Sequence, residues 1–473
     1  MREVSGTAPE SELLTADPLA PADALAPADP LAPAPAPDGA PALATPATPL
    51  RNSSLWRHRD YMKIWSASTV SLMGSQVSQI AIPYIAAVVL HAAAFQVALL
   101  GGLEMLPFIL FALPAGAWLD RVRRRPVLIA GDLGRAAALI TIPIAYAFGV
   151  LTVWQLYAVG FVAGTLTVFF DVADQSYLPV LLEEDELVDG NAKLQISASA
   201  AQVFGPGLGG GLIGLVAAPF AVIVDAVSFV ASGGLISLIR KNESKPERKI
   251  AADGSRTSLR QEIAEGLRYV IGNRYLRMIA GCTGTSNLGS SIAFSIFPIF
   301  AYVQLGLSAG LIGLASGLGA LGVLLGAFIS APLSRRLGVG PVILASIFVS
   351  GGAMFFIAAM PSDPLTAGIL MTAAMFLTSV SAVVYNVNQV SFRQAITPLD
   401  IQGRMNATMR FIVWGTMPVG FLIGGILGSF LPLRTAILIG AVVSATAFLW
   451  IVASPVRSLR EIPKGARAGV SAE

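Results

Sequence analysis

A cluster of arginines separates two long apolar runs and constrains the fold of this chain more than any other feature. The upstream run, 92–119, contains one charged residue, Glu104, and the downstream run, 127–152, contains only Asp132 and Arg135. Each run can cross the ~30 Å hydrocarbon core of a bilayer, because a membrane helix needs roughly 20 mostly apolar residues. The turn between the runs must therefore lie in water, and its arginines predict that it is cytoplasmic.

The composition of the chain supports a membrane protein with several spans. Of its 473 residues, 55% are hydrophobic and 12% are charged, which is too apolar for a soluble protein of this length. Cys282 is the only cysteine, so the chain alone cannot hold a disulfide framework or a cysteine-based metal site. The sequence also lacks the G-x-x-x-x-G-K-[ST] pattern of a phosphate-binding loop, which argues against an ATP-driven pump. We expect no enzymatic activity, no cofactor and no resident metal.

Twelve candidate spans follow Arg51, and the loops between them differ in charge. Lysines and arginines gather in every second loop, including ten between positions 240 and 277, whereas the other loops contain essentially only Arg434. This asymmetry predicts that both termini are cytoplasmic. The expected spans are 63–90, 96–119, 127–149, 153–178, 191–217, 219–239, 278–303, 309–333, 341–361, 365–390, 406–431 and 433–454.

The chain divides into five expected parts. Residues 1–54 are an Ala- and Pro-rich cytoplasmic tail that cannot bury enough apolar surface to fold, so we expect it to be disordered. Two six-span halves, 55–240 and 278–455, flank a basic cytoplasmic linker, 241–277, in which apolar residues recur at helical spacing. We expect this linker to contain an amphipathic helix on the inner membrane surface. Residues 456–473 form a second cytoplasmic tail.

An internal repeat relates the two halves. Adding 215 to a residue number in the first half gives its counterpart in the second, so that Gly74 matches Gly289 and Pro83 matches Pro298. One offset holds across loops as well as spans, which chance similarity between Ala- and Gly-rich segments would not maintain. The repeat predicts an all-α membrane protein with twelve transmembrane helices, arranged as two six-helix halves with pseudo-two-fold symmetry.

The basic loop also carries a family pattern. The residues that form it are Gly116, Asp120, Arg121, Arg124 and Arg125. Their spacing resembles the loop between spans two and three of the major facilitator superfamily. The resemblance implies the major facilitator fold and a gating role for this loop. In that role Asp120 contacts residues 403–406, at the start of the eleventh span, and holds the inner side shut.

A second pattern lies in the fifth span. Gly205, Pro206, Gly209 and Gly210 resemble the G-P-x-x-G-G motif of major facilitator antiporters. Pro206 removes a backbone hydrogen-bond donor and loosens the helix, and the glycines allow a neighbouring helix to approach closely. Packing of small residues alone is the alternative explanation for these glycines.

Longer phrases resemble one branch of this superfamily. Residues 170–179, 190–195, 225–229 and 403–407 are similar to bacterial drug:proton antiporters, which include enterobactin exporters and macrolide-efflux proteins. The resemblance implies that a monomer in the bacterial inner membrane exports amphipathic small molecules, such as drugs, siderophores or secondary metabolites, in exchange for protons. Such export confers multidrug resistance, and no nucleic-acid partner is expected. The alternatives are an importer or lipid transporter with the same fold, and a membrane sensor or scaffold that transports nothing.

Acidic residues inside the predicted spans are candidates for proton coupling, because an ionisable group at membrane depth is costly and is functional by default. They are Glu104, Asp171, Asp174 and Asp225. Glu104 lies about eight residues into its span, or ~12 Å below the outer edge of the hydrocarbon core. The alternatives are a Glu104 that only packs and an Asp225 that makes a structural hydrogen bond. Asp132 and Arg135 lie three residues apart and can pair with each other on one helix face.

The substrate cavity is expected between the halves, lined by the first, fourth, seventh and tenth spans. Polar side chains recur in these spans at roughly helical spacing, which places them on one face. The cavity candidates are Gln76, Gln79, Asn287, Ser291, Tyr385, Asn386, Asn388 and Gln389. Hydrogen bonding between neighbouring helices is the alternative role for these side chains.

Overall fold

The computed structural model describes residues 55–119, 122–182, 186–241, 243 and 259–460. Within these residues the regular elements are all helical. The predicted N-terminal tail lies outside the described residues, as do Asp120 and Arg121 of the predicted gating loop.

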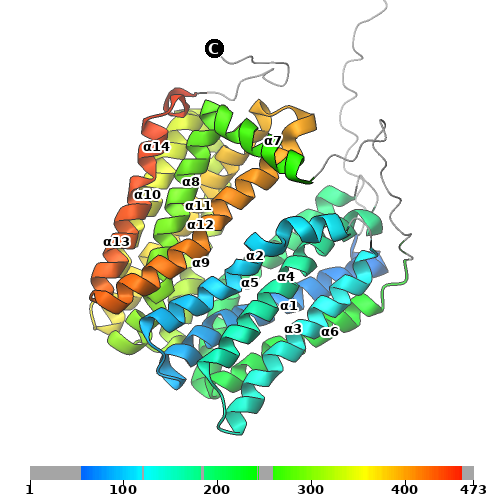
Figure 1. Ribbon diagram of the computed structural model, residues 1–473, viewed down its shortest axis with the longest axis vertical. Helices are drawn as coiled ribbons and strands as arrows, with labels where there is room; N and C mark the ends of the chain where they lie inside the picture. The colour runs from blue at the N-terminus through cyan, green and yellow to red at the C-terminus, as the bar shows by residue number, and fades with distance from the viewer. Residues whose placement is uncertain (1–54, 120–121, 183–185, 242, 244–258, 461–473) are drawn as a thin grey trace, which may run out of the picture. The chain divides into compact units, whose positions relative to one another are not determined.

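Six long helices make up the first half and are coloured blue to green in Figure 1. After a short 3-10 turn at Leu55–Arg57, they are α1 (Arg59–Tyr84), α2 (Ala94–Leu119), α3 (Arg124–Ala147), α4 (Val153–Leu181), α5 (Leu187–Leu215) and α6 (Ala218–Ser237). A π-helical segment, η2 (Ile85–Val89), continues α1.

The second half follows helix α7 (Leu259–Gly272) and is coloured green to red in Figure 1. Its helices are α8 (Arg274–Pro298), α9 (Ala309–Leu337), α10 (Val339–Ala358), α11 (Pro364–Ile396), α12 (Leu399–Phe430), α13 (Leu433–Thr446) and α14 (Phe448–Val452). A π-helical segment, η3 (Ile299–Gln304), continues α8, and a 3-10 turn at Pro455–Ser458 ends the described chain.

Eleven helical stretches among the described residues are long and apolar enough to cross a membrane, if α13 and α14 count as one. Helix α5 is the twelfth span, since its 29 residues reach ~44 Å at 1.5 Å per residue. Its first turns are too polar to stand out by hydropathy, and there Lys193 forms an ion pair with Asp189. Because α5 packs between α1 and α9, the motif glycines Gly205, Gly209 and Gly210 are buried against protein. The result is the predicted set of twelve transmembrane helices in two halves.

The backbone repeats the 215-residue offset where the first span of each half ends. Pro83 near the end of α1 and Pro298 at the end of α8 precede η2 and η3. Proline has no N–H to donate, so the regular α-helical hydrogen bonding is interrupted near it. The segment that follows has the wider hydrogen-bond spacing of a π-helix. After the π-helical segment, each half turns through a residue of positive φ: His91 at 50° in the first half and Gly306 at 66° in the second. The two halves therefore share their geometry as well as their sequence pattern.

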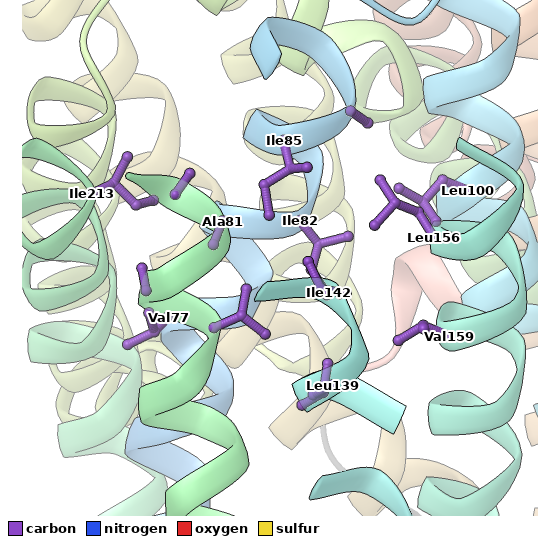
Figure 2. Close-up of a cluster of buried hydrophobic side chains, with 14 of the residues drawn as sticks. Val77, Ala81, Ile82, Ile85, Leu100, Leu139, Ile142, Leu156, Val159 and Ile213 are labelled. Atoms are coloured by element: carbon purple, nitrogen blue, oxygen red, sulfur yellow. The ribbon is translucent and has the colours of Figure 1, made fainter. Parts of the chain in front are cut away.

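Figure 2 shows the apolar core of the first half. Val77 of α1, Ile142 of α3 and Leu156 of α4 are buried there. Lipid tails are as apolar as these side chains, so close van der Waals packing stabilises the bundle more than removal from water does. Small residues permit this packing: a Cβ atom at Gly74 of α1 would overlap with Ser228 of α6.

The helices of each half run alternately in opposite directions, which defines two ends of the bundle (Figure 1). One end carries the last residues of α1 and α5 and the first residues of α2 and α9. We call it the predicted outer end. The opposite end carries the arginines between α2 and α3, and we call it the predicted inner end because basic loops mark the cytoplasmic side.

Candidate functional site

The glycines of the fifth-span motif hold α5 tightly against α1. A Cβ atom at Gly205 would overlap with the side chain of Gln76, and one at Gly209 would lie 3.1 Å from the Cα of Val77. At both positions the neighbouring atoms of α1 would have to move to make room for a side chain. The motif therefore fixes a close helix–helix contact within the first half.

The second half repeats this contact with the same offset. Gly420 of α12 packs against Ser291 of α8, and Gly424 packs against Ile292. Ser291 is the counterpart of Gln76, since the two positions differ by 215. The proline of the second copy is Pro418, three positions before the counterpart of Pro206, yet the glycines of this copy pack in the same way.

The last glycine of each copy packs across the two halves. A Cβ atom at Gly210 would overlap with the carbonyl oxygen of Ala309 in α9, and one at Gly425 would lie 2.7 Å from the Cβ of Ala98 in α2. The rings of Tyr84 and Tyr302 also meet edge to face, with centroids 5.0 Å apart. All three contacts lie at the predicted outer end, where the two halves are closed on each other.

We expect Gly205→Leu to reduce transport at least tenfold, because overpacking a tight contact costs about 1–3 kcal/mol and Gln76 cannot leave without moving α1. Pro206→Ala should reduce transport less, since alanine fits the same space and restores a helical hydrogen bond. Uptake of a labelled substrate by proteoliposomes, normalised to the amount of reconstituted protein, measures both effects. Near-normal uptake with Gly205→Leu would show that this contact does not limit transport.

A cavity lies between the halves on the inner side of these contacts. It is lined by residues of α2, α4 and α12, which are the second, fourth and eleventh spans. Phe108 of α2 meets Trp414 of α12 edge to face, with ring centroids 5.5 Å apart. The guanidinium carbon of Arg410 lies 4.9 Å from the centre of the Trp414 ring. Asp171 of α4 faces the same cavity from the first half.

The cavity therefore combines an apolar, aromatic wall with one group of each charge. Asp171 and Arg410 interact electrostatically, but no ion pair or hydrogen bond joins them in the described structure. Gln175 is the third polar residue of the lining. An apolar pocket with a few convergent polar groups is the usual form of a small-molecule site.

None of the eight residues predicted to line the substrate cavity is among the residues that line this pocket. Tyr385 donates or accepts a hydrogen bond with Thr283 at 2.6 Å, and Asn287 donates to the backbone oxygen of Val413 at 3.1 Å. Asn388 hydrogen-bonds Ser330 at 3.2 Å. In this conformation these side chains act as contacts between helices, which was the alternative. Ser291 and Gln389 are also buried, Gln76 packs on α5, and Gln79 and Asn386 are exposed.

The described part of the predicted gating loop is held by Glu243, which follows α6. Its carboxylate accepts hydrogen bonds from the backbone N–H groups of Arg124 at 2.8 Å and Arg125 at 3.1 Å. These N–H groups open α3, so the carboxylate caps the positive end of that helix. The guanidinium of Arg125 donates to the backbone oxygen of Ile236 at 3.2 Å. Gly116 has open space at its Cβ position.

The start of α12, where the gating loop is predicted to dock, contacts the linker helix, while Asp120 itself lies outside the described residues. Arg404 forms an ion pair with Glu265 of α7. A Cβ atom at Gly266 would lie 2.9 Å from the backbone oxygen of Arg404. Helix α7 is therefore fixed against α12 at the predicted inner end.

One buried arginine lies among the acids of the first half. Arg135 pairs with Asp132 at 2.6 Å, which confirms the predicted pairing. Its guanidinium carbon lies 4.3 Å from the ring centre of Phe170 and 4.1 Å from that of Phe229. The two rings and the carboxylate surround the cation, which compensates its burial.

The other acids have different surroundings. Asp225 is 2% exposed and accepts hydrogen bonds from Ser228 at 3.3 Å and Ser75 at 3.4 Å. Asp174 interacts electrostatically with Asp171, and Glu104 with Asp225. No hydrogen bond to the Glu104 carboxylate is present among the described residues. In the part of the chain that the structure describes, no group of His, Cys, Asp and Glu could hold a metal ion.

Sequence reasoning missed two functional features. The capping role of Glu243 depends on the fold, because 119 residues separate it from Arg124. The contribution of α12 to the cavity was indicated in the sequence, because Arg410 and Trp414 lie four residues apart on one helix face inside an apolar span. What the sequence alone did not reveal is that this face meets α2 and α4.

Comparisons with known proteins agree with this architecture. Residues 45–468 match the model of a family described as transmembrane secretion effector. The multidrug efflux pump Tap of Mycolicibacterium fortuitum is 27% identical over 332 residues, which cover 68% of this chain and 77% of Tap. Macrolide efflux protein A of Streptococcus pyogenes is 24% identical over 389 residues, which cover 78% of this chain and 89% of that protein.

The fold is shared with solved transporter structures. A bacterial homologue of the iron transporter ferroportin, in its inward-facing state, superposes with a TM-score of 0.64 at 17% identity, covering 83% of this chain and 98% of that one. The predicted fold class and the predicted resemblance to efflux proteins are therefore confirmed. The chain belongs to the transmembrane secretion effector family of the major facilitator superfamily, whose members are multi-pass membrane transporters and not enzymes.

Proposed function

We propose that this protein exports amphipathic small molecules from the bacterial cytoplasm by proton antiport, with alternating access of a site between its two halves. The observation that carries the proposal is the cavity formed by α2, α4 and α12, which joins both halves and combines aromatic side chains with Asp171 and Arg410. Relatives named as multidrug and macrolide efflux proteins support export and a drug-like substrate. Siderophores and secondary metabolites belong to the same chemical class.

The proposed orientation places both termini and α7 in the cytoplasm of a cell with an inner membrane. The basic loops support it, because short loops rich in Lys and Arg stay inside. In this orientation the contacts at Gly210 and Gly425 close the periplasmic side, so the conformation is inward-facing. Both halves belong to one chain, and this chain supplies the residues that line the cavity, which supports a functional monomer.

The gating loop and linker are proposed to exchange partners during transport. In the present conformation Arg404 is paired with Glu265 of α7. In the inward-closed state the start of α12 is proposed to contact the loop that contains Asp120, with Arg404 as a partner of that carboxylate. Glu243 keeps the same loop attached to α6 in the described conformation, so the loop and the first half are proposed to move as one unit.

Proton coupling is proposed to use the acids of the first half. The interior of that half contains five acids: Glu104, Asp132, Asp171, Asp174 and Asp225. Arg135 is the one buried cation among its described residues, and it is already paired with Asp132. Five carboxylates beside one described cation cannot all be ionised at low cost, so some of them are expected to bind and release protons.

The eight polar cavity candidates are proposed to contact substrate only in another conformation.

Reconstitution into proteoliposomes tests this function, with radiolabelled erythromycin as a macrolide probe. An acidic lumen should drive accumulation above that of protein-free liposomes, because protons leave as the drug enters. Erythromycin is a weak base and is itself trapped by acid, so the protein-free value is subtracted at each pH. Accumulation in an alkaline lumen instead would identify a proton-coupled importer, and no difference from protein-free vesicles would favour a sensor or scaffold.

A further inference from the structure

We infer that the cavity selects zwitterionic molecules, with a cationic group at Asp171, an acidic group at Arg410 and an aromatic ring between them. This inference rests on the proposed export function and specifies its substrate class. It depends on three features: Asp171 and Arg410 face the same cavity, no hydrogen bond or ion pair joins them among the described residues, and aromatic side chains line the same space.

Arg410 has no acidic partner within its own half. Between positions 274 and 452 the chain contains two carboxylates, Asp363 and Asp400. Asp363 caps the outer end of α11 by accepting a hydrogen bond from the Thr366 N–H at 2.8 Å. Asp400 lies ten residues before Arg410, or ~15 Å along the axis of α12. Helices α8 to α14 therefore offer Arg410 no nearby acidic partner, and Asp171 of the first half faces it across the cavity.

Asp171 is the matching group on the other side of the cavity. The nearest cation of its own half, Arg135, is held by Asp132 at 2.6 Å and lies between two phenylalanine rings. The position that corresponds to Asp171 in the second half is Asn386, so the repeat has placed a charge on one side only. In the part of the chain described here, no hydrogen bond to the Asp171 carboxylate is present. The carboxylate is therefore available to a cationic group of the ligand.

The aromatic lining of this cavity suits a ring. Trp414 and Phe108 form an edge-to-face pair on one side, and Phe411 and Val168 add apolar surface. The cavity measures ≈160 Å³ in this conformation. An engineered apolar cavity of about 150 Å³ binds benzene, so this space accommodates one aromatic ring.

Charge selectivity follows from the cost of leaving either group unpaired. A ligand with only a cation would desolvate Arg410 without giving it an acceptor, and a ligand with only an anion would do the same to Asp171. An unpaired, desolvated charge costs several kcal/mol, and sites that are built to pair a polar group reject analogues that lack it. A zwitterion satisfies both groups at once, and the pocket remains electrically neutral.

Three matched probes test the inference: 4-(aminomethyl)benzoate, which is a zwitterion, its cationic methyl ester, and its anionic N-acetyl derivative. Binding to the full-length protein in detergent is measured by titration calorimetry. We expect the zwitterion to bind at least tenfold more tightly than either derivative. The Arg410→Gln variant should lose the preference for the zwitterion over the ester, and the Asp171→Asn variant should lose the preference for the zwitterion over the N-acetyl derivative. Arg457→Gln, at an exposed position after α14, is the control and should keep the parent's preference.

Equal binding of the three probes by the parent, or no binding of the zwitterion, would overturn the inference. So would tighter binding of the neutral N-acetyl methyl ester, because Asp171 and Arg410 would then satisfy each other. Failure of the proposed function is seen separately, in the erythromycin assay. Proton-driven erythromycin transport without charge preference would leave export intact and remove the zwitterion site. Charge preference without transport would do the reverse.

Discussion

Replacing Gly210 with leucine should reduce transport to the background of protein-free vesicles. A Cβ atom at this position would overlap with the carbonyl oxygen of Ala309 and lie 3.1 Å from the Cα of Gly310. Both are backbone atoms of α9, which cannot rotate away as a flexible side chain can. A leucine would therefore hold the two halves apart at the predicted outer end. A transporter that cannot close this end cannot complete its cycle.

Gly211→Leu provides a matched control, because it makes the same substitution one residue along α5 where a Cβ atom meets nothing within 4 Å. It should transport at close to the parent rate. Labelling distinguishes a failure to close from a failure to fold: in a Cys282→Ser background, a cysteine at Val88 in η2 should react with an impermeant thiol reagent faster in Gly210→Leu than in the parent. Equal transport by the two leucine variants would show that the contact at Gly210 is not part of the cycle.

The internal repeat allowed much of this fold to be predicted from sequence. The 215-residue offset held in the structure down to the contacts of individual glycines, with Gly205 on α1 and Gly420 on α8. Such contacts can be predicted from sequence, because two helix backbones approach this closely only at small residues. The spacing of the glycines therefore indicates where the helices pack. Helix α5 was also predicted, as the span 191–217, although the polar first turns of the observed helix keep it below a hydropathy criterion.

The candidate site was less predictable, because its residues meet only through tertiary structure. Asp171 was recognised as a buried acid, yet its partner across the cavity, Arg410, lies 239 positions away in the other half. Polar residues such as Tyr385 and Asn287 have the spacing of a cavity face, but the same spacing serves contacts between neighbouring helices. Periodicity identifies a helix face, whereas the identity of the surface opposite it depends on the conformation of the transporter.

Helix α7 shows how a linker can take part in the same cycle. It is joined to α12 by the ion pair between Glu265 and Arg404 and by the close approach at Gly266. Both contacts lie at the predicted inner end. The pair between Glu265 and Arg404 is partly exposed, so its energy is small and it can be exchanged. This suits a partner that changes between conformations better than a permanent clamp.

Replacing Glu104 with glutamine should abolish proton-driven accumulation while leaving substrate binding unchanged. Glutamine keeps the shape and hydrogen-bonding capacity of the side chain and removes its ability to carry a proton. Glu104 lies where α2 packs tightly on α4, since a Cβ atom at Gly164 would overlap with its backbone oxygen, and its charge interacts with that of Asp225. A second negative charge beside Asp225 is unfavourable in this low-dielectric interior, which favours a carboxyl group that takes up and releases a proton.

The expected size of the effect follows from the gradient. One pH unit corresponds to ~1.4 kcal/mol, so exchange of one proton per substrate supports accumulation of about tenfold. The parent should approach this ratio in vesicles with a lumen one unit more acidic, and Glu104→Gln should reach a ratio near one after the protein-free value is subtracted. Asp363→Asn is the matched control, because it also converts an acid to an amide, and asparagine caps a helix as well as aspartate does.

Two further variants separate coupling from packing. If Glu104 serves only to fill space between α2 and α4, the glutamine variant will pump as the parent does, and the coupling site must be sought in Asp171 or Asp174 through their asparagine variants. If Glu104 carries the proton, Asp225→Asn should still accumulate substrate, because Asp225 is 2% exposed and is held by Ser75 and Ser228 in a structural role. Loss of accumulation in both Glu104→Gln and Asp225→Asn would instead show that the proton is shared between the two carboxylates, as expected for acids close enough to titrate together.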